Sequence, residues 1–238
     1  MKIMQKTLLA VMLAASASQA VAAGDSVDVS VIGQIVPAAC TPALSGSATF
    51  DYGTIKAETI AKDDFTVLPV KNLNFTIMCE AAMKVAVYGN DVRASSSIGS
   101  PNDLNITVNA AKNQKLNGLG LNGKALIGGY SLYMSDSSIN VDGKTVDTIY
   151  AAAGSVKPNE SGVWNKQSDP TTVFNGNYAK GYNSFYQSWA KAGDITPVAF
   201  KTLNGVLSVQ AIINKRSELD LTQTITLDGL NTISLYYL

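Results

Sequence analysis

Short runs in which apolar and polar residues alternate dominate the chain, and this period of two predicts β-strands. Turns rich in glycine and asparagine divide the runs, and we find no internal repeat and no long helical period. Gly, Ser, Thr, Asn and Val are abundant while only 15% of the residues are charged, which is typical of a turn-rich all-β domain. Strands are expected at residues 48–55, 67–78, 83–88, 104–108, 125–134, 198–203, 205–213 and 221–238, with a hairpin turn at Asp142-Gly143.

The clearest alternation lies directly before the first cysteine, within residues 24–36. A period of two places its apolar and glycine positions on one face of an extended strand. A strand at a free end can pair with its own sheet or with the sheet of another chain, and the pattern alone leaves both interpretations open. The positions on that face are Val27, Val29, Val31, Gly33 and Ile35.

The segment that precedes this stretch has the organisation of a secretory signal peptide. Lys2 and Lys6 form a basic start, a short apolar run follows, and small residues end at Ala22 and Ala23. The apolar run is too short to span a membrane. We therefore expect residues 1–23 to be removed by cleavage after Ala22 or Ala23, and the rest of the chain to be exported.

Charge and residue usage exclude several classes of function. The 18 basic and 18 acidic residues balance, and removal of the two leader lysines leaves a slightly acidic chain with no electrostatic reason to bind nucleic acid or anionic lipid. Histidine is absent, so Ser-His and Cys-His nucleophile systems and histidine metal sites are excluded. In an exported chain, Cys40 and Cys79 are expected to form a structural disulfide rather than a redox pair, which would favour C-x-x-C spacing.

The C-terminal stretch ends in a second alternating pattern. A strand that runs to the last residue must be docked, because loose termini normally fray. The residues of one parity in this stretch are Ile225, Leu227, Gly229, Ile233, Leu235 and Tyr237.

Residues 135–193 differ from the rest because turn residues dominate them, which predicts a loop-rich insertion. The spacing of Tyr182, Phe185 and Trp189 predicts a short helix within it. The aromatic residues of this region either form a small satellite core or offer ring faces to a sugar, and the satellite core is the interpretation we favour. They are Trp164, Phe174, Tyr178, Tyr182, Phe185, Tyr186 and Trp189.

Taken together, these features resemble the subunits of chaperone–usher fimbriae, the pili of Gram-negative bacteria. The resemblance rests on the extension GQIVPAAC with Gly33 ahead of Cys40, on the strand NFTIMC that enters Cys79, and on the penultimate Tyr237. It covers both ends of the chain well and the middle poorly. The chain is longer than usual members by several tens of residues, which we assign to the insertion, and Gly229 lies nearer the C-terminus than the glycine of the family does.

The resemblance implies an immunoglobulin-like β-sandwich over residues 37–238 that lacks its last strand and is completed in trans by a donor strand. Residues 24–36 would be the donor extension, in which Val27, Val29, Val31 and Ile35 fill the groove and Gly33 occupies a place without room for a side chain. Ile233, Leu235 and Tyr237 would border the groove where a periplasmic chaperone pairs. The other implied partners are neighbouring fimbrial subunits and the outer-membrane usher, and the implied location is the cell surface, reached through the periplasm.

These features predict a structural subunit of a fimbria that contributes to cell adhesion, with no cofactor, no metal and no enzymatic activity. The alternative is an exported, self-complete β-sandwich that binds carbohydrate through the aromatic insertion. A carboxylate-dependent hydrolase is disfavoured, because no pair of acidic residues has a spacing that indicates an acid–base pair.

Overall fold

A computed structural model describes residues 29–34, 38–109, 115–152, 164–167, 171–173 and 185–238. The chain divides into two units, Met1–Val36 and Pro37–Leu238. In the first unit, residues 29–34 have no regular secondary structure, and Val29, Val31 and Ile32 are 82%, 95% and 93% exposed. The predicted signal peptide, Val27 and Ile35 lie outside the described residues.

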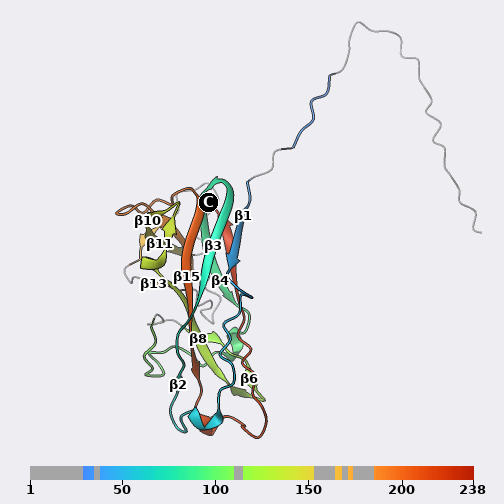
Figure 1. The fold of residues 1–238 in the computed structure, drawn as a ribbon, viewed down its shortest axis with the longest axis vertical. Helices are drawn as coiled ribbons and strands as arrows, with labels where there is room; N and C mark the ends of the chain where they lie inside the picture. Colours follow the sequence, from blue (N-terminus) through green and yellow to red (C-terminus); the bar gives the residue numbers. More distant parts are fainter. Residues whose placement is uncertain (1–28, 35–37, 110–114, 153–163, 168–170, 174–184) are drawn as a thin grey trace, which may run out of the picture. The chain divides into compact units, whose positions relative to one another are not determined.

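The second unit contains two large antiparallel sheets (Figure 1). The main path of the first sheet has the order β1-β3-β15-β8-β13, in which β15 pairs with β3 on one side and with β8 on the other. Its strands are β1 (Cys40–Leu44), β3 (Lys71–Met83), β15 (Phe200–Ile213), β8 (Gly128–Ser135) and β13 (Thr171–Val173), with the short β2 (Thr66–Val67), β5 (Asn117–Gly118), β9 (Asn140–Val141) and β10 (Lys144–Thr145) attached.

The second sheet has the order β12-β11-β14-β4-β16, so the C-terminal strand β16 lies at its edge. A separate hairpin joins β6 (Leu121–Asn122) to β7 (Ala125–Leu126). The strands of the second sheet are β12 (Asn165–Lys166), β11 (Asp147–Ala152), β14 (Phe185–Ala190), β4 (Val85–Asp91) and β16 (Asn231–Tyr237). The 3₁₀ turns are η1 (Ala57–Thr59), η2 (Ala94–Ser96), η3 (Asp136–Ser138) and η4 (Arg216–Glu218).

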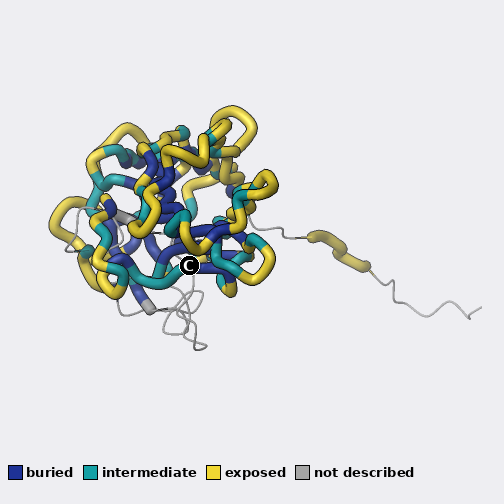
Figure 2. The backbone as a smooth tube through the Cα atoms, turned by 90° about the horizontal axis from the view of Figure 1, so that it is seen from below, coloured by how far each residue is buried: buried dark blue, intermediate teal, exposed yellow. Residues whose placement is uncertain are grey.

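The main core unites side chains of both sheets, as expected for a β-sandwich (Figure 2). Trp189 of the second sheet and Phe200 of the first are both 0% exposed, and their rings meet edge to face at 5.8 Å. Other members of this core include Phe75, Ile77, Val85, Val87, Met134, Leu203 and Leu207. The all-β prediction is therefore confirmed, with two antiparallel sheets consistent with a sandwich.

Several predicted strands are confirmed, and the differences have physical explanations. The expected strands 198–203 and 205–213 are one continuous strand, β15, because Asn204 and Gly205 pair within the ladder to β3. The predicted turn at Asp142-Gly143 joins β9 to β10, with positive φ values of 49° and 75°. Residues 104–108 form no strand: they begin in a turn and continue irregularly, so that prediction is wrong.

The middle of the chain also differs from its prediction. Within residues 135–193, β11 and β14 are inner strands of the second sheet, so the described part of this region is built into the sandwich. The predicted helix is wrong over Phe185–Ala190, which form β14. The four-residue spacing of Phe185 and Trp189 fits a helix, but it also fits a strand, where residues four apart share a face. Phe174, Tyr178 and Tyr182 lie outside the described residues.

The predicted disulfide is confirmed between Cys40 and Cys79, which face each other across β1 and β3 with Cα atoms 4.0 Å apart. The bridge joins two residues that are 39 positions apart in the sequence. A disulfide suggests a protein that folds outside the cytoplasm. Among the described residues, no helix is long and apolar enough to cross a membrane.

Candidate functional site

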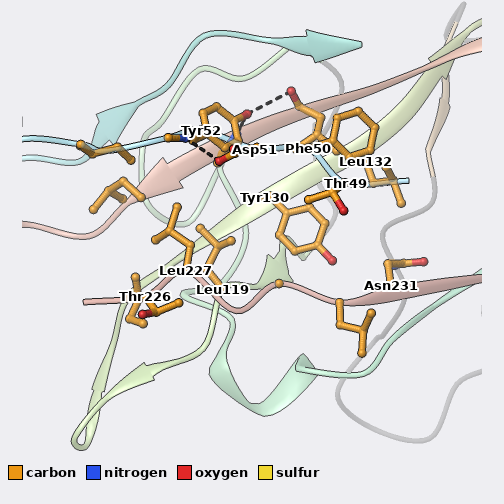
Figure 3. Close-up of a pocket in the computed structure, with 18 of the residues that line it drawn as sticks. Thr49, Phe50, Asp51, Tyr52, Leu119, Tyr130, Leu132, Thr226, Leu227 and Asn231 are labelled. Atoms are coloured by element: carbon orange, nitrogen blue, oxygen red, sulfur yellow. Dashed lines mark hydrogen bonds between the residues drawn. The ribbon is translucent and has the colours of Figure 1, made fainter. Parts of the chain in front are cut away.

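A groove of about 1000 Å³ opens the core of the sandwich between two extended segments that are far apart in sequence (Figure 3). One wall is formed by β1 and the segment that follows it, and the other by residues 221–231 and the start of β16. The floor consists of side chains that also belong to the main core, and each of them is at most 9% exposed. The floor residues are Phe75, Leu119, Ile127, Tyr130, Leu132, Leu207, Val209, Ala211, Ile213 and Leu219.

One residue of the floor, Tyr130 of β8, projects its ring into the groove. Tyr130 lies opposite Ala211 of β15, whereas the neighbouring cross-strand pair on the same face is Leu132 and Val209. From the opposite wall, Gly229 packs so tightly against Tyr130 that a Cβ atom there would lie 2.7 Å from its ring. In Figure 3 this ring stands in the middle of the groove. At this row a large ring thus lies between two small residues, Ala211 and Gly229.

The hydroxyl of Tyr130 is the main polar group of the floor. Burial raises the pKa of this hydroxyl, with a smaller contribution from the charge of Asp91, so it remains a protonated hydrogen-bond donor at neutral pH. Asp91 is itself buried, and accepts hydrogen bonds from the backbone N–H groups of Arg93 and Gly118 at 2.9 Å each. Burial raises the pKa of Asp91, and these two bonds oppose the shift.

In the first wall, backbone pairing to the sheet ends just after β1. The backbone bond from Ser45 N–H to the carbonyl of Asn74 continues the ladder to β3, but residues 49–56 have no assigned strand. Tyr52 anchors this segment through its side chain. Its hydroxyl donates to the carbonyl of Val209 at 3.3 Å and accepts from the N–H of Ala211 at 3.2 Å. The predicted strand at residues 48–55 is thus an irregular segment, which the hydroxyl of Tyr52 joins to β15 and whose Phe50 and Ile55 pack against the core.

The second wall is held mainly from its outer side. Asp228 forms a bidentate ion pair with Arg93, at 2.8 and 3.1 Å, and its N–H donates to the carbonyl of Leu119 at 2.9 Å. Asn231 donates to the side chain of Asn117 at 3.1 Å. Among the described residues, β16 pairs only with β4, so its other edge faces the groove.

The two walls meet at one end of the groove. The hydroxyl of Tyr237, in β16, accepts a hydrogen bond of 2.9 Å from the N–H of Cys40, in β1. This bond joins the edge of the second sheet to the edge of the first. Tyr237 remains 39% exposed.

The structure brings some of the predicted site residues together. Ile233 lines the groove, Leu235 packs against the core, and Tyr237 accepts a hydrogen bond from Cys40 of β1. Val29, Val31 and Gly33 belong to the other unit, where nothing lies within 4 Å of a Cβ built on Gly33. Sequence reasoning missed Tyr52 and Tyr130, because an isolated tyrosine in a strand carries no pattern that marks its role.

The aromatic residues proposed for the alternative, sugar-binding function are partly accounted for. Trp164 and Trp189 are 7% and 0% exposed, so neither offers a ring face to a sugar. Tyr186 stacks on Tyr236, with ring centroids 4.6 Å apart, and meets Tyr88 edge to face at 5.4 Å. These rings pack on one another across three strands of the second sheet. Of the predicted satellite core, Trp164 and Tyr186 belong to a small second cluster, whereas Trp189 lies in the main core.

Comparisons with known proteins give relatives without an assigned activity. The family model described as "Protein of unknown function (DUF1120)" matches residues 29–128. Two proteins of Escherichia coli (strain K12) are similar over nearly the whole chain. "Uncharacterized protein YhcF" is 25% identical over 228 residues, covering 91% of this chain and 92% of that protein. "Protein GltF" is 28% identical over 240 residues, covering 91% of each.

No solved structure matches the chain significantly. Because the two relatives are covered almost end to end, the length of this chain, including its middle region, is a feature that it shares with them. The matched family model also spans the exposed alternating residues 29–34 and both cysteines. The similarity thus includes the N-terminal extension as well as the sandwich.

Proposed function

We propose that this chain is a structural subunit of a surface fimbria, which polymerises by donating its N-terminal extension to the groove of the next subunit. The observation that carries the proposal is the groove, whose floor belongs to the hydrophobic core and whose two wall strands, β1 and β16, each pair on one edge only among the described residues. The fold would then be an immunoglobulin-like sandwich that lacks one strand.

The groove has an energetic cost that an added strand removes. The floor side chains are at most 9% exposed, so the gain from covering apolar surface, roughly 25 cal/mol for each Å² removed from water, comes mainly from the partly exposed walls. An unpaired sheet edge also offers backbone groups that another chain can bind. A single extended segment placed between the walls would cover the floor and pair with β16. An extended peptide is therefore the ligand that fits this site best.

The chain carries a segment with the required pattern. Val29, Val31 and Ile32 are among the most exposed large apolar residues of the described chain, which favours their burial against a partner. The second wall follows the groove from Thr224 to Ile233, and the alternating stretch runs from Val27 to Val36. At about 3.3 Å per residue, both would extend over roughly 33 Å.

Gly33 is the residue of the extension that would fit over Tyr130, whose ring projects from the floor of the groove. A strand that crosses Tyr130 has little room for a side chain at that row, and glycine is the residue that needs none. If Gly33 lies over Tyr130 and the strand runs antiparallel to β16, then Val31, Val29 and Val27 reach the rows of Asn231, Ile233 and Leu235. Ile35 then falls beside Leu227. In this register the residues of the predicted face, Val29, Val31 and Ile35, lie at rows that line the groove, and Val27 lies one row beyond, at Leu235.

Before assembly, the same groove would be covered by a periplasmic chaperone, and exchange for the next subunit's extension would occur at an outer-membrane usher. This assigns the protein to the cell surface, reached through the periplasm, with a part in adhesion and no enzymatic activity. The partners follow from the resemblance described above, and the groove supports them because it needs a strand at every stage.

A peptide-binding experiment tests the proposal without a cognate chaperone. The chain is refolded with its disulfide intact and titrated with a synthetic peptide that copies residues 24–36. We expect binding, together with a peptide-dependent increase in the unfolding midpoint, because a ligand that binds only the folded state stabilises it. A peptide carrying Gly33→Leu should bind about 5- to 150-fold more weakly, since overpacking costs about 1–3 kcal/mol.

The matched control is a peptide carrying Gln34→Leu. It adds the same side chain one position further on, where a strand of period two points away from the floor. It should bind as the unchanged peptide does. Equal weakening by both substitutions, or no binding of any peptide, would contradict the proposed function.

A further inference from the structure

The hydroxyl of Tyr130 is a polar group without a partner on an otherwise apolar floor. Tyr130 is 6% exposed and lines the groove, and the other floor residues carry no side-chain hydrogen-bonding group. Among the described residues, the structure gives this hydroxyl no hydrogen-bond partner, and in Figure 3 it points into the groove. Polar groups that are this deeply buried are normally hydrogen-bonded, so an unpaired one indicates a partner that binds here.

Water can serve as this partner only while the groove is empty. A strand laid between the walls, as proposed above, would displace water from the ring. A covered donor that finds no acceptor opposes binding, because it loses its bond to water and gains none. Burial raises the pKa of the hydroxyl, so it keeps its proton and stays a donor. The entering strand therefore has to bring an acceptor to this point.

The extension can supply that acceptor only from its backbone. In the register proposed above, Gly33 lies over Tyr130 and has no side chain. The flanking side chains on the same face, Val31 and Ile35, are apolar, and Gln34 points away from the floor. The main chain at Gly33 is left above the ring. A carbonyl oxygen has two lone pairs, so it can accept from a wall and from the hydroxyl at once.

We propose that Tyr130 is a specificity-determining residue of the groove: its hydroxyl donates a hydrogen bond to a main-chain carbonyl of the entering strand at Gly33. This rests on the proposed function. Glycine is then required for two reasons. A side chain at this position would crowd the ring, and it would also separate the hydroxyl from the carbonyl. The two reasons can be separated by experiment, because phenylalanine keeps the ring without the hydroxyl.

The first test compares the refolded chain with its Tyr130→Phe variant. Because the hydroxyl has no protein partner in the empty groove, its loss should leave the urea unfolding of the free chain unchanged. The peptide that copies residues 24–36 should bind the variant about 2- to 10-fold more weakly in calorimetric titration, as expected for one lost hydrogen bond. If the covered hydroxyl found no acceptor, the variant would instead bind the peptide more tightly.

The second test adds a peptide carrying Gly33→Ala. Crowding of the ring alone predicts the same loss of affinity in both chains, since both keep the ring. The proposed bond predicts a loss at least about 2-fold larger in the unchanged chain than in Tyr130→Phe. The matched control is Tyr133→Phe, which removes a hydroxyl from the opposite face of β8, away from the groove. This control should bind both peptides as the unchanged chain does.

A spectroscopic readout observes the acceptor itself. The peptide is labelled with ¹³C at the carbonyls of Val29, Ile32 and Gly33. The signal of Ile32 or Gly33 in the bound peptide should differ between the unchanged chain and Tyr130→Phe, because the hydrogen bond polarises that carbonyl. The signal of Val29 should be the same in both complexes.

The outcomes separate the role of the hydroxyl from the function on which it rests. Unchanged or tighter binding to Tyr130→Phe, or an equal cost of Gly33→Ala in both chains, would overturn this role while leaving the groove a peptide site. Absence of peptide binding to all three chains would overturn both proposals.

Discussion

The two sides of this sandwich use similar residues and reach different states. On the closed side, β15 has a strand on each edge, and its Leu203 is 0% exposed. On the open side, Leu227 and Ile233 share the same core but lie on a wall whose other edge has no described strand. The two sides therefore do not differ in the type of apolar residue that they use. They differ in the number of strands that the chain supplies to them.

This difference teaches that a protein can leave part of its core unfinished without losing the rest. The open side is held at separate points: by the disulfide at Cys40, by the hydroxyl of Tyr52 and by the ion pair of Asp228. Each of these can be removed individually. The following predictions do so, and compare each loss with a change on the closed side.

The largest difference is expected between two leucine truncations. Leu203→Ala removes a fully buried side chain and should lower the free energy of unfolding by about 2–5 kcal/mol. Leu227→Ala, in the groove wall, should cost about 1 kcal/mol or less, because that site is already partly hydrated. Urea unfolding of the oxidised chain measures both. Equal losses would show that the groove is closed in solution.

Loss of the disulfide comes next. Replacing Cys40 and Cys79 together with serine should lower the free energy of unfolding by roughly 3 kcal/mol, since the bridge closes a loop with a separation of 39 residues. The loss should appear first as faster hydrogen exchange in β1, with the ladder between β15 and β8 protected until global unfolding. Simultaneous loss of protection in both regions would mean that the open wall is not a separate unit of stability.

How far the sequence predicts these regions depends on which interactions define them. The alternation of Ile233, Leu235 and Tyr237 correctly predicts a terminal strand, and the spacing of Cys40 and Cys79 in an exported chain correctly predicts their bridge. Both patterns are local or depend on a pair of rare residues. The alternation at residues 48–55 also predicts a strand, but none is assigned there, because alternation does not show whether a neighbouring strand is present to pair with.

The interior of the groove was beyond prediction for a different reason. Tyr130 rises between Ala211 and Gly229, which come from distant parts of the chain, and only the register between β8 and β15 brings them together. Phe185 and Trp189 fit a helix as well as they fit β14, and the sheet around them decides between the two. Residues whose roles come from long-range register carry no local signal.

A smaller effect is expected from Tyr52→Phe. Without the hydroxyl, the carbonyl of Val209 and the N–H of Ala211 lose a shared partner, and we expect a loss of about 1 kcal/mol. Amides of residues 49–56 should exchange faster, and peptide binding in the groove should weaken. Tyr88→Phe, on the second sheet, is the matched control and should leave both measurements unchanged. An unaltered exchange rate in Tyr52→Phe would show that other contacts hold this wall.

The smallest effect concerns acid. Arg93 holds the pKa of Asp228 below its ordinary value, through a hydrogen bond and the charge of the guanidinium. A carboxyl whose pKa is lowered in the folded state stabilises the fold at pH values above its unfolded pKa, about 3.9, and this contribution is lost as the pH falls through the folded value. The pair is exposed, so the change should be slight.

Asp228→Asn and Arg93→Gln should each flatten the dependence of stability on pH between about 2 and 4. The double variant should flatten it no further, since both substitutions remove one interaction. Additive effects of the two substitutions would show that each residue stabilises the second wall through a different contact.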